Sequence, residues 1–328
     1  MWINQIFGVL WAMMASLMPG LDDGVHRDNP TEPSPAGPSV AKQYFPNDLH
    51  PGGGITLTPG FAPDGETIYF AQSSCAPIWE CPQYLKRSHR TKTGWSTPEL
   101  VPLPDRRRAD YPSVTPDGHR LLFSWQKSHP GTNEEKPDEN FDLWQIDLTE
   151  HEGNPLPLKG PDLNRVRAGA VRTLRFVNNE TAPFLTRDGD LYFWTERLDG
   201  LGDRDVYRAA SDGKGGYEVP IPLPAPINSA GSDDGMWISP DGRTMLITYA
   251  DRGGCGGSDV FIAYKMQSRW SEPRNLGCAI NSPYDELAAS IIPHTDQIVF
   301  PSNRPVDGSS LNEFRLWTAR LPGPAQRE

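Results

Sequence analysis

The stretch Ser232–Ile247, SDDGMWISPDGRTMLI, decides the fold of this chain. An acidic start leads into a short apolar run, a tight SPDG turn and a second apolar run. In such a turn, Pro presets φ at the second position, Asp bonds back to the local backbone and Gly accepts the positive φ that follows. The pattern therefore predicts a β-hairpin whose turn is centred on Asp241.

Versions of this hairpin recur along the chain. Their turns are centred on Asp64, Asp117, Asp188, Asp241 and His294. The intervals between these centres are 53, 71, 53 and 53 residues, and the longer interval carries its extra residues within 159–178. Because a fixed period of this size is typical of repeat architectures, we expect five copies of one structural unit.

Each turn is followed by strand-like segments rather than by helix periodicity. In TIYF from Thr67 both alternating positions are apolar, which indicates a strand covered on both faces. Proline in outer segments such as RWSEPRNL from Arg269 confines them to sheet edges. Four-stranded units bury both faces when they stack radially, so the sequence predicts an all-β fold, a β-propeller of five four-stranded blades, with six blades as the alternative.

Closure of this ring is expected from the two ends of the repeat region. The fifth unit has no outer strand of its own after RLWTARL, which starts at Arg315. The one unassigned β-capable segment is AKQYF, Ala41–Phe45. We therefore expect this N-terminal strand to complete the fifth blade and close the propeller.

The N-terminal residues differ in composition from the repeats. Residues 6–18 form a continuous apolar run, which fits the h-region of a secretory signal better than a membrane-spanning helix. We expect residues 1–20 to be a signal peptide or an uncleaved anchor, and the Pro/Ser/Asp-rich residues 21–40 to be a disordered linker. The propeller is expected over residues 41–322, followed by a tail at residues 323–328.

Charge and cysteine content limit the classes of partner and the cellular compartment that we expect for this chain. The net charge of −11 and a pI near 5.1 argue against a binder of the phosphate backbone, so no nucleic-acid partner is expected. An even number of cysteines without metal-ligand spacing indicates paired disulfides in an oxidising compartment rather than a zinc site. The cysteines concerned are Cys75, Cys81, Cys255 and Cys278.

Residues 270–305 carry a more specific pattern, WSEPRNLGCAINSPYDELAASIIPHTDQIVFPSNRP. Its pieces W-S-x-P, N-L-G, I-N-S, D-E and S-N-R-P resemble the WD40-like PD40 repeat of TolB-type propellers. The preceding unit repeats I-N-S at residues 227–229, and the resemblance spans residues 55–321. It implies a propeller exported to the periplasm, the cell envelope or the exterior, but these repeats serve many roles.

Charged residues recur near the predicted hairpins. Acidic residues precede the turns, where they would ring one mouth of the central channel and suit a cation or a basic peptide, or else cap loops within each blade. Arginines follow the central strands, where we expect them to pair with Asp205 and Asp259 or to meet an anionic ligand. The candidate binding residues are Asp110, Glu180, Asp233, Asp234, Asp285, Glu286, Arg197, Arg252 and Arg304.

These observations favour an exported, monomeric, non-enzymatic binding or scaffolding module. Its ligand, a protein or a small carbohydrate or peptide, is expected on the rim that carries the longer loops and the connections between blades. No catalytic residue and no metal site are predicted. Calcium stays an alternative as a cofactor, because the chain could be a calcium-stabilised, lectin-like domain. The alternative is a propeller glycoside hydrolase that uses channel carboxylates. Membrane contact is expected only through an uncleaved N-terminal segment.

Overall fold

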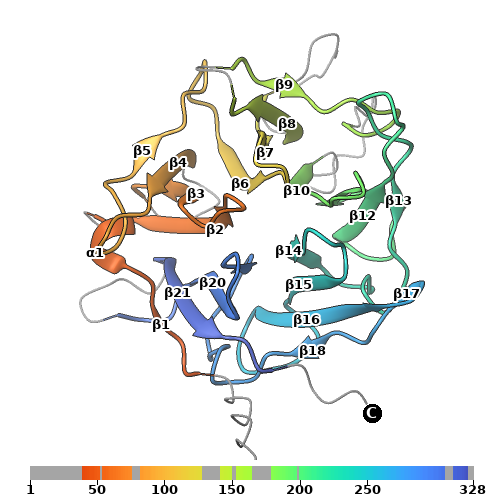
Figure 1. The fold of residues 1–328 in the computed structure, drawn as a ribbon. Coiled ribbons are helices and arrows are strands. Elements are labelled where there is room, and N and C mark those ends of the chain that lie inside the picture. Colours follow the sequence, from red (N-terminus) through yellow and green to blue (C-terminus); the bar gives the residue numbers. More distant parts are fainter. Residues whose placement is uncertain are drawn as a thin grey trace, which may run out of the picture. The chain divides into compact units, whose positions relative to one another are not determined.

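Five small antiparallel sheets lie around a common centre and form the five blades of a β-propeller (Figure 1). This computed structural model describes residues 39–51, 54–75, 82–127, 141–149, 153–164, 179–197, 199–306 and 313–323. The predicted signal or anchor, most of the predicted linker and most of the tail lie outside these ranges. Within them, no helix has both the length and the apolar character needed to cross a membrane.

The five sheets confirm the prediction of five repeated units. In the first four blades the strands follow one another along the chain from the innermost strand to the outermost. The first contains β2 (Ile55–Phe61), β3 (Thr67–Ser73), β4 (Tyr84–His89) and β5 (Glu99–Leu100). The second contains β6 (Ala109–Val114), β7 (Arg120–Trp125), β8 (Asp142–Asp147) and β9 (Leu156–Pro157). The third contains β10 (Glu180–Leu185), β11 (Leu191–Thr195), β12 (Asp205–Ala209) and β13 (Ile221–Pro222). The fourth contains β14 (Asp233–Ile238), β15 (Thr244–Tyr249) and β16 (Asp259–Met266), with β17 (Arg269–Trp270) and β18 (Arg274–Asn275) both paired to β16.

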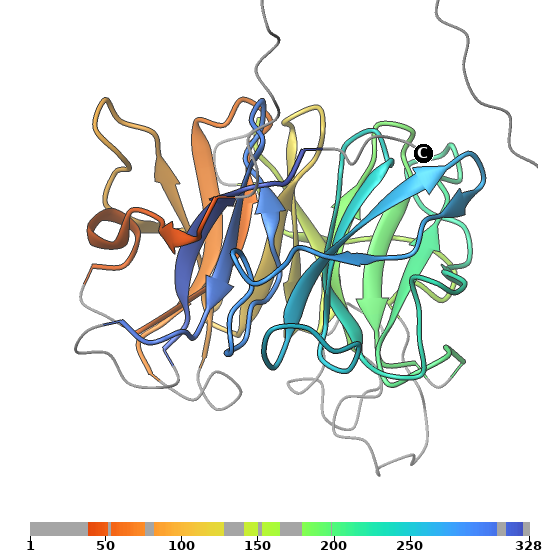
Figure 2. The same cartoon turned by 90° about the horizontal axis from the view of Figure 1, so that it is seen from below.

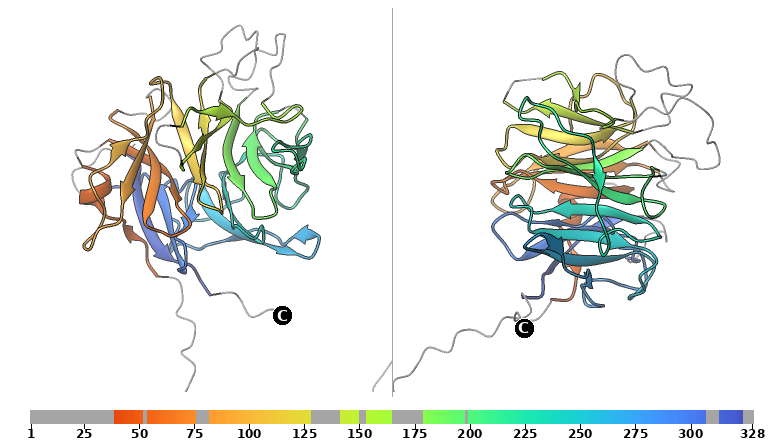
Figure 3. Two further views of the ribbon diagram at one scale, coloured as in Figure 1. Left: turned by 45° about the horizontal axis from the view of Figure 1, so that its top comes forward. Right: turned by 90° about the vertical axis from the view of Figure 1, so that its right-hand side faces the viewer.

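The fifth blade joins the two ends of the repeat region, as the sequence predicts. It contains β19 (Ser290–Ile291), β20 (Gln297–Ser302) and β21 (Arg315–Arg320), and its outer strand is β1 (Lys42–Gln43). Lys42 is paired with Thr318 and Gln43 with Trp317 in an antiparallel register. Figure 3 shows β1 beside β21, followed by the short helix α1 (Pro46–Leu49).

A residue with positive φ, which the sequence does not predict, interrupts the innermost strand of the first four blades and lies just before β19 in the fifth. These residues are Thr58, Tyr111, Ala182, Gly235 and Ala288, with the spacing of the turns. In the first four blades the strand register shifts at this point, as in a β-bulge. The repeat unit is therefore a bulged hairpin and not a regular one.

A main-chain hydrogen bond crosses every interface between neighbouring blades. The donor is the N–H two residues before each bulge, and the acceptor is the carbonyl just before the third strand of the preceding blade. The five bonds are Ala109 to Gln83, Glu180 to Phe141, Asp233 to Arg204, Glu286 to Ser258 and Thr56 to Phe314, with N···O distances of 2.8 to 3.0 Å. The last bond connects the first blade to the fifth and so closes the ring.

Apolar side chains fill the spaces between the blades. One cluster packs Tyr69 of the first blade against Phe123 of the second, and another packs Trp194 of the third against Met236 of the fourth. Five such clusters are present in the described part of the chain, one for each interface. The doubly apolar strands are therefore covered on both faces, as their sequences indicate.

The antiparallel topology gives the ring two different faces (Figure 2). One, which we call the turn face, carries the five tight turns between first and second strands, including those at Asp64 and Asp241. The opposite one, the loop face, carries the connections from second to third strand and from each blade to the next. The start of every innermost strand lies at the loop face, and its end lies at the turn face.

We expect Tyr44→Ala to destabilise the closed ring by about 3 kcal/mol, because a large aromatic side chain is removed from a packed site. Tyr44 follows β1, is 5% exposed, and contacts Phe45 and Trp95. Urea unfolding of the full chain measures the change. Lys42→Ala, at an exposed position of β1, is the control and should stay within about 0.5 kcal/mol of wild type. Equal losses in both variants would contradict the structural role given to this segment.

Candidate functional site

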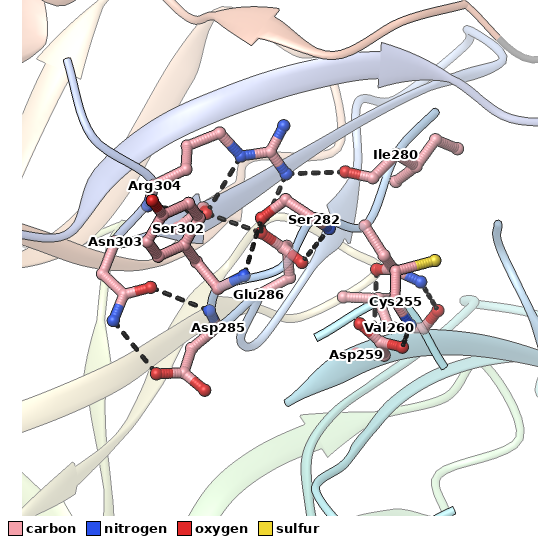
Figure 4. A network of polar contacts seen from close by, with 12 residues as sticks. Cys255, Asp259, Val260, Ile280, Ser282, Asp285, Glu286, Ser302, Asn303 and Arg304 are labelled. Carbon is pink, nitrogen blue, oxygen red and sulfur yellow. Dashed lines mark hydrogen bonds and ion pairs between the residues drawn. The ribbon is translucent and has the colours of Figure 1, made fainter. Parts of the chain in front are cut away.

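Three of the predicted acidic residues are fully buried and bind groups within the protein. Glu180, Asp233 and Glu286 share one repeat position, two residues before the bulge, and each is 0% exposed. Glu286 accepts hydrogen bonds from the N–H of Ser282 at 2.7 Å, the Ser282 hydroxyl at 2.6 Å and Arg304 at 2.8 Å (Figure 4). These contacts hold the connection from the fourth blade to the fifth.

Asp233 repeats this arrangement one blade earlier. Its carboxylate accepts from the N–H and the hydroxyl of Ser229, at 2.5 and 2.7 Å. Burial raises the pKa of Asp233 to about 6 and also raises the pKa of Glu286. The serine of the I-N-S pattern therefore recurs because it binds the carboxylate four residues later.

The three predicted arginines bind main-chain carbonyls of the connection that enters their blade. Arg197 donates to the carbonyl of Leu163 at 2.7 Å, and its guanidinium also contacts Glu180 at 2.9 Å. Arg304 donates to the carbonyl of Ile280 at 2.6 Å. Each guanidinium is thus committed to protein partners at the loop face.

Arg252 also binds a main-chain carbonyl of the connection that enters its blade. The arginine–aspartate pairs expected from the sequence are replaced by other contacts. Arg252 donates to the carbonyl of Ile227 at 3.0 Å and lies 3.9 Å from the ring centroid of Tyr249. Asp205 accepts from the N–H of Gly202 at 3.0 Å, and Asp259 accepts from the N–H of Cys255 at 2.6 Å. The aspartates therefore cap their own loops.

The asparagine of the I-N-S pattern completes the blade edge. Asn281 accepts from the N–H of Val260 at 2.9 Å and donates to its carbonyl at 3.1 Å, so the side chain replaces a missing strand. Asn228 makes the same two contacts with Val206, at 2.9 and 3.0 Å. The motif that carries the PD40 resemblance is thus explained by the architecture of the blade.

A disulfide also lies at the loop face. Cys255 and Cys278 are bonded with a Cα–Cα distance of 5.5 Å, and the bond joins the loop before β16 to the connection after β18. Cys75 is also disulfide-bonded. Cys81, the other cysteine of that predicted set, lies outside the described residues.

The remaining predicted acids, Asp110, Asp234 and Asp285, lie at the loop face and make separate contacts. Asp110 and Asp234 each stand one residue before a bulge. Asp234 pairs with Arg204 at 2.6 Å, and Arg204 also pairs with Glu196 at 2.9 Å. Burial raises the pKa of Glu196 to about 7. Sequence reasoning missed Arg204 and Glu196, because neither recurs from blade to blade.

Asp110 and Asp285 are also engaged by the protein. Asp110 accepts from the Thr58 hydroxyl at 2.7 Å, and Asp285 accepts from the N–H of Ser258 and from Asn303, both at 3.0 Å. The nine predicted binding residues are therefore distributed among separate blade contacts. In the part of the chain that the structure describes, no three His, Cys, Asp or Glu side chains gather in a way that could hold a metal ion.

A pocket of about 340 Å³ opens at the centre of the turn face, opposite the rim on which the sequence places the ligand. All five blades line it with the end of the innermost strand and the following turn. Its apolar lining includes Val114, Phe184, Trp237 and Ile291. Such a concave, mostly apolar site is typical of ligand-binding pockets.

Copies of the repeat differ from one another at the pocket. Two residues after the bulge, Ser113 donates to the carbonyl of Pro183 and Ser290 to the carbonyl of Pro59, which joins neighbouring blades. Phe184 and Trp237 occupy the same repeat position in the third and fourth blades. Their partly buried rings line the pocket instead of making this contact.

Two polar departures from the repeat also line the pocket. Arg187 stands where the other turns have proline, and His294 stands where they have aspartate. Both side chains are exposed. The sequence shows these departures, and a comparison of the five turns would find them, but it does not show that they meet at one pocket.

Comparison with protein-family models and with curated proteins finds no match by sequence. Solved structures match in fold. A putative TolB from Agrobacterium tumefaciens is 17% identical, with 76% of this chain and 70% of that one covered and a TM-score of 0.45. TolB from Acinetobacter baumannii is 16% identical, with 83% and 55% covered and a TM-score of 0.43. The α-L-arabinofuranosidase PaAbf62A from Podospora anserina is 12% identical, with 88% and 96% covered and a TM-score of 0.49.

One prediction is corrected by these matches. The sequence-based prediction that the chain is not an enzyme is wrong as drawn. Structures of similar fold include arabinofuranosidases and prolyl endopeptidases beside TolB proteins. A propeller fold does not by itself separate binding modules from hydrolases.

We expect the stability of wild type relative to Glu196→Gln to fall as pH rises from about 4.5 to about 7. The folded-state pKa of Glu196 is raised, so the carboxyl is neutral at low pH and must ionise in a buried site at higher pH. The relative loss should be on the order of 3 kcal/mol and should level off above pH 7. Urea unfolding of both proteins between pH 5 and 8 measures it. A difference that does not change with pH would contradict the assignment, as would a Glu196 carboxyl that titrates near pH 4 by carbon NMR.

Proposed function

We propose that this chain is an exported binding propeller of the cell envelope that holds an apolar segment of a protein partner in the turn-face pocket. The observation that carries the proposal is the pair Phe184 and Trp237. These residues break the repeat at one position and place aromatic rings in a pocket built by all five blades. Positions that follow the repeat maintain the blades, so departures that gather at one pocket indicate a separate role.

The size and lining of the pocket support an apolar side chain as the anchor. A volume of about 340 Å³ lies within the range of ligand pockets. Burying one large apolar side chain there contributes about 1.5–3 kcal/mol, and aromatic anchors often dominate the affinity of protein interfaces.

The loop face offers less support for the partner site. The acids and arginines that the sequence marks there already bind serines, loop N–H groups and main-chain carbonyls within the blades. A ligand would have to compete with these buried contacts. The proposal therefore assigns the partner to the turn face.

Export is supported by two independent features. The Cys255–Cys278 disulfide fits an oxidising compartment. The apolar run at residues 6–18 has the length of a secretory h-region. Together they support the periplasm or the cell envelope as the compartment in which the partner is met.

We expect Trp237→Ala to lower the affinity for the partner at least tenfold, because an aromatic anchor is removed from the centre of the contact. Wild-type and variant chains are immobilised, and the envelope proteins that each retains are compared quantitatively. Leu100→Ala is the matched control, since Leu100 is an exposed apolar residue on the outer strand β5. Its retained proteins should equal those of wild type.

Two outcomes would contradict this proposal. One is an unchanged set of retained proteins with Trp237→Ala. The other is an equal loss of retained proteins with both variants, which would indicate non-specific binding to exposed apolar side chains. Thermal unfolding of the variants separates loss of the pocket from loss of the fold.

A further inference from the structure

We infer that the turn-face pocket recognises the C-terminal residue of a polypeptide, with the apolar side chain against Phe184 and Trp237 and the α-carboxylate on Arg187. This inference rests on the proposed function, because it names the kind of segment that the same pocket takes. The supporting observations are the position of Arg187, the second donor His294, and the way the neighbouring carboxylates are engaged.

Arg187 presents a cation to an apolar pocket from a fixed turn. Its N–H donates to the carbonyl of Pro240 in the next blade at 2.7 Å, so the backbone is held. The guanidinium is exposed, and it makes no ion pair within the described ranges, whereas Arg197, Arg204 and Arg304 all pair with carboxylates. Since a guanidinium binds a carboxylate through two parallel hydrogen bonds, Arg187 suits that group.

His294 supplies a second donor on the other side of the pocket. It belongs to the turn of the fifth blade, and Arg187 belongs to the turn of the third. The fourth blade lies between them and contributes Trp237 to the lining. The pocket thus has an aromatic ring between two groups that can donate to a carboxylate.

No carboxylate of the turns lines the pocket, and this includes Asp188, which follows Arg187 in its turn. The other turns carry Asp64, Asp117 and Asp241, and each accepts an N–H two residues later in its own turn, at 2.9 to 3.1 Å. None of them lines the pocket. An incoming carboxylate therefore meets two donors and no acidic lining residue.

A chain terminus fits these features better than an internal acidic residue. In a C-terminal residue the apolar side chain and the carboxylate leave the same Cα, so one residue satisfies both the rings and the guanidinium. An internal segment must enter and leave a pocket of about 340 Å³ at the ring centre, whereas a terminus only has to enter. Recognition of a terminal carboxylate is a known mode of peptide binding.

The test uses two labelled peptides, Gly-Gly-Ser-Gly-Phe with a free C-terminus and the same peptide as the C-terminal amide. Binding to the full chain is measured by fluorescence anisotropy. We expect the free acid to bind about tenfold more tightly than the amide, because a charge-assisted contact is lost in the amide. Arg187→Gln should remove this preference, and Trp237→Ala should weaken both peptides.

Arg243→Gln is the matched control, since Arg243 lies beside the turn of the fourth blade and does not line the pocket. It should keep the preference for the free acid. Equal binding of both peptides to wild type, or an unchanged preference in Arg187→Gln, would overturn the inference while leaving the partner site in place. Failure of both peptides to bind would also overturn it, and the partner retention of Trp237→Ala then decides the proposed function separately.

Discussion

The ring depends on one main-chain hydrogen bond that is repeated at every interface. The N–H of a residue near the start of each innermost strand donates to the carbonyl that precedes the third strand of the blade before it. A blade cannot bury both of its faces alone, so neighbours must be held in register before the apolar clusters between them can pack. A buried N–H without a partner would cost about 1–3 kcal/mol at each interface. The contact between Thr56 and Phe314 makes the chain of interfaces a closed ring.

The most recognisable parts of the sequence maintain this arrangement at the loop face. Asn281 substitutes for a strand partner, Ser282 and Arg304 bind the buried Glu286, and the guanidinium also holds the incoming carbonyl. Asn228, Ser229 and Arg252 make the corresponding contacts at the junction before the fourth blade, so these residues recur because the two junctions are built alike. Function is therefore better sought where the copies differ, and Trp237 at the turn face is such a place.

Much of the fold follows from local pattern, and less of the site does. The period, the turns and closure by Lys42–Gln43 could be predicted, because each depends on short signals that repeat. The bulges at Thr58 and Tyr111 could not be predicted from the sequence, since neither residue is a glycine, the residue type that indicates a positive φ. The hydrogen-bond partners of Arg252 could not be predicted either, because they are main-chain carbonyls about 25 residues away in the sequence. Arg187 was visible as a departure from the turn pattern, but its place in a pocket follows only from the ring.

Native-state hydrogen exchange by NMR tests the closed ring most directly. The amides of Thr56, Ala109, Glu180, Asp233 and Glu286 each report one interface between blades. If the ring is closed and cooperative, all five should exchange with the same opening free energy, equal to that of global unfolding. An amide of Thr56 that exchanges with a much smaller opening free energy than the other four would show an open seam between the fifth and first blades and would contradict this account.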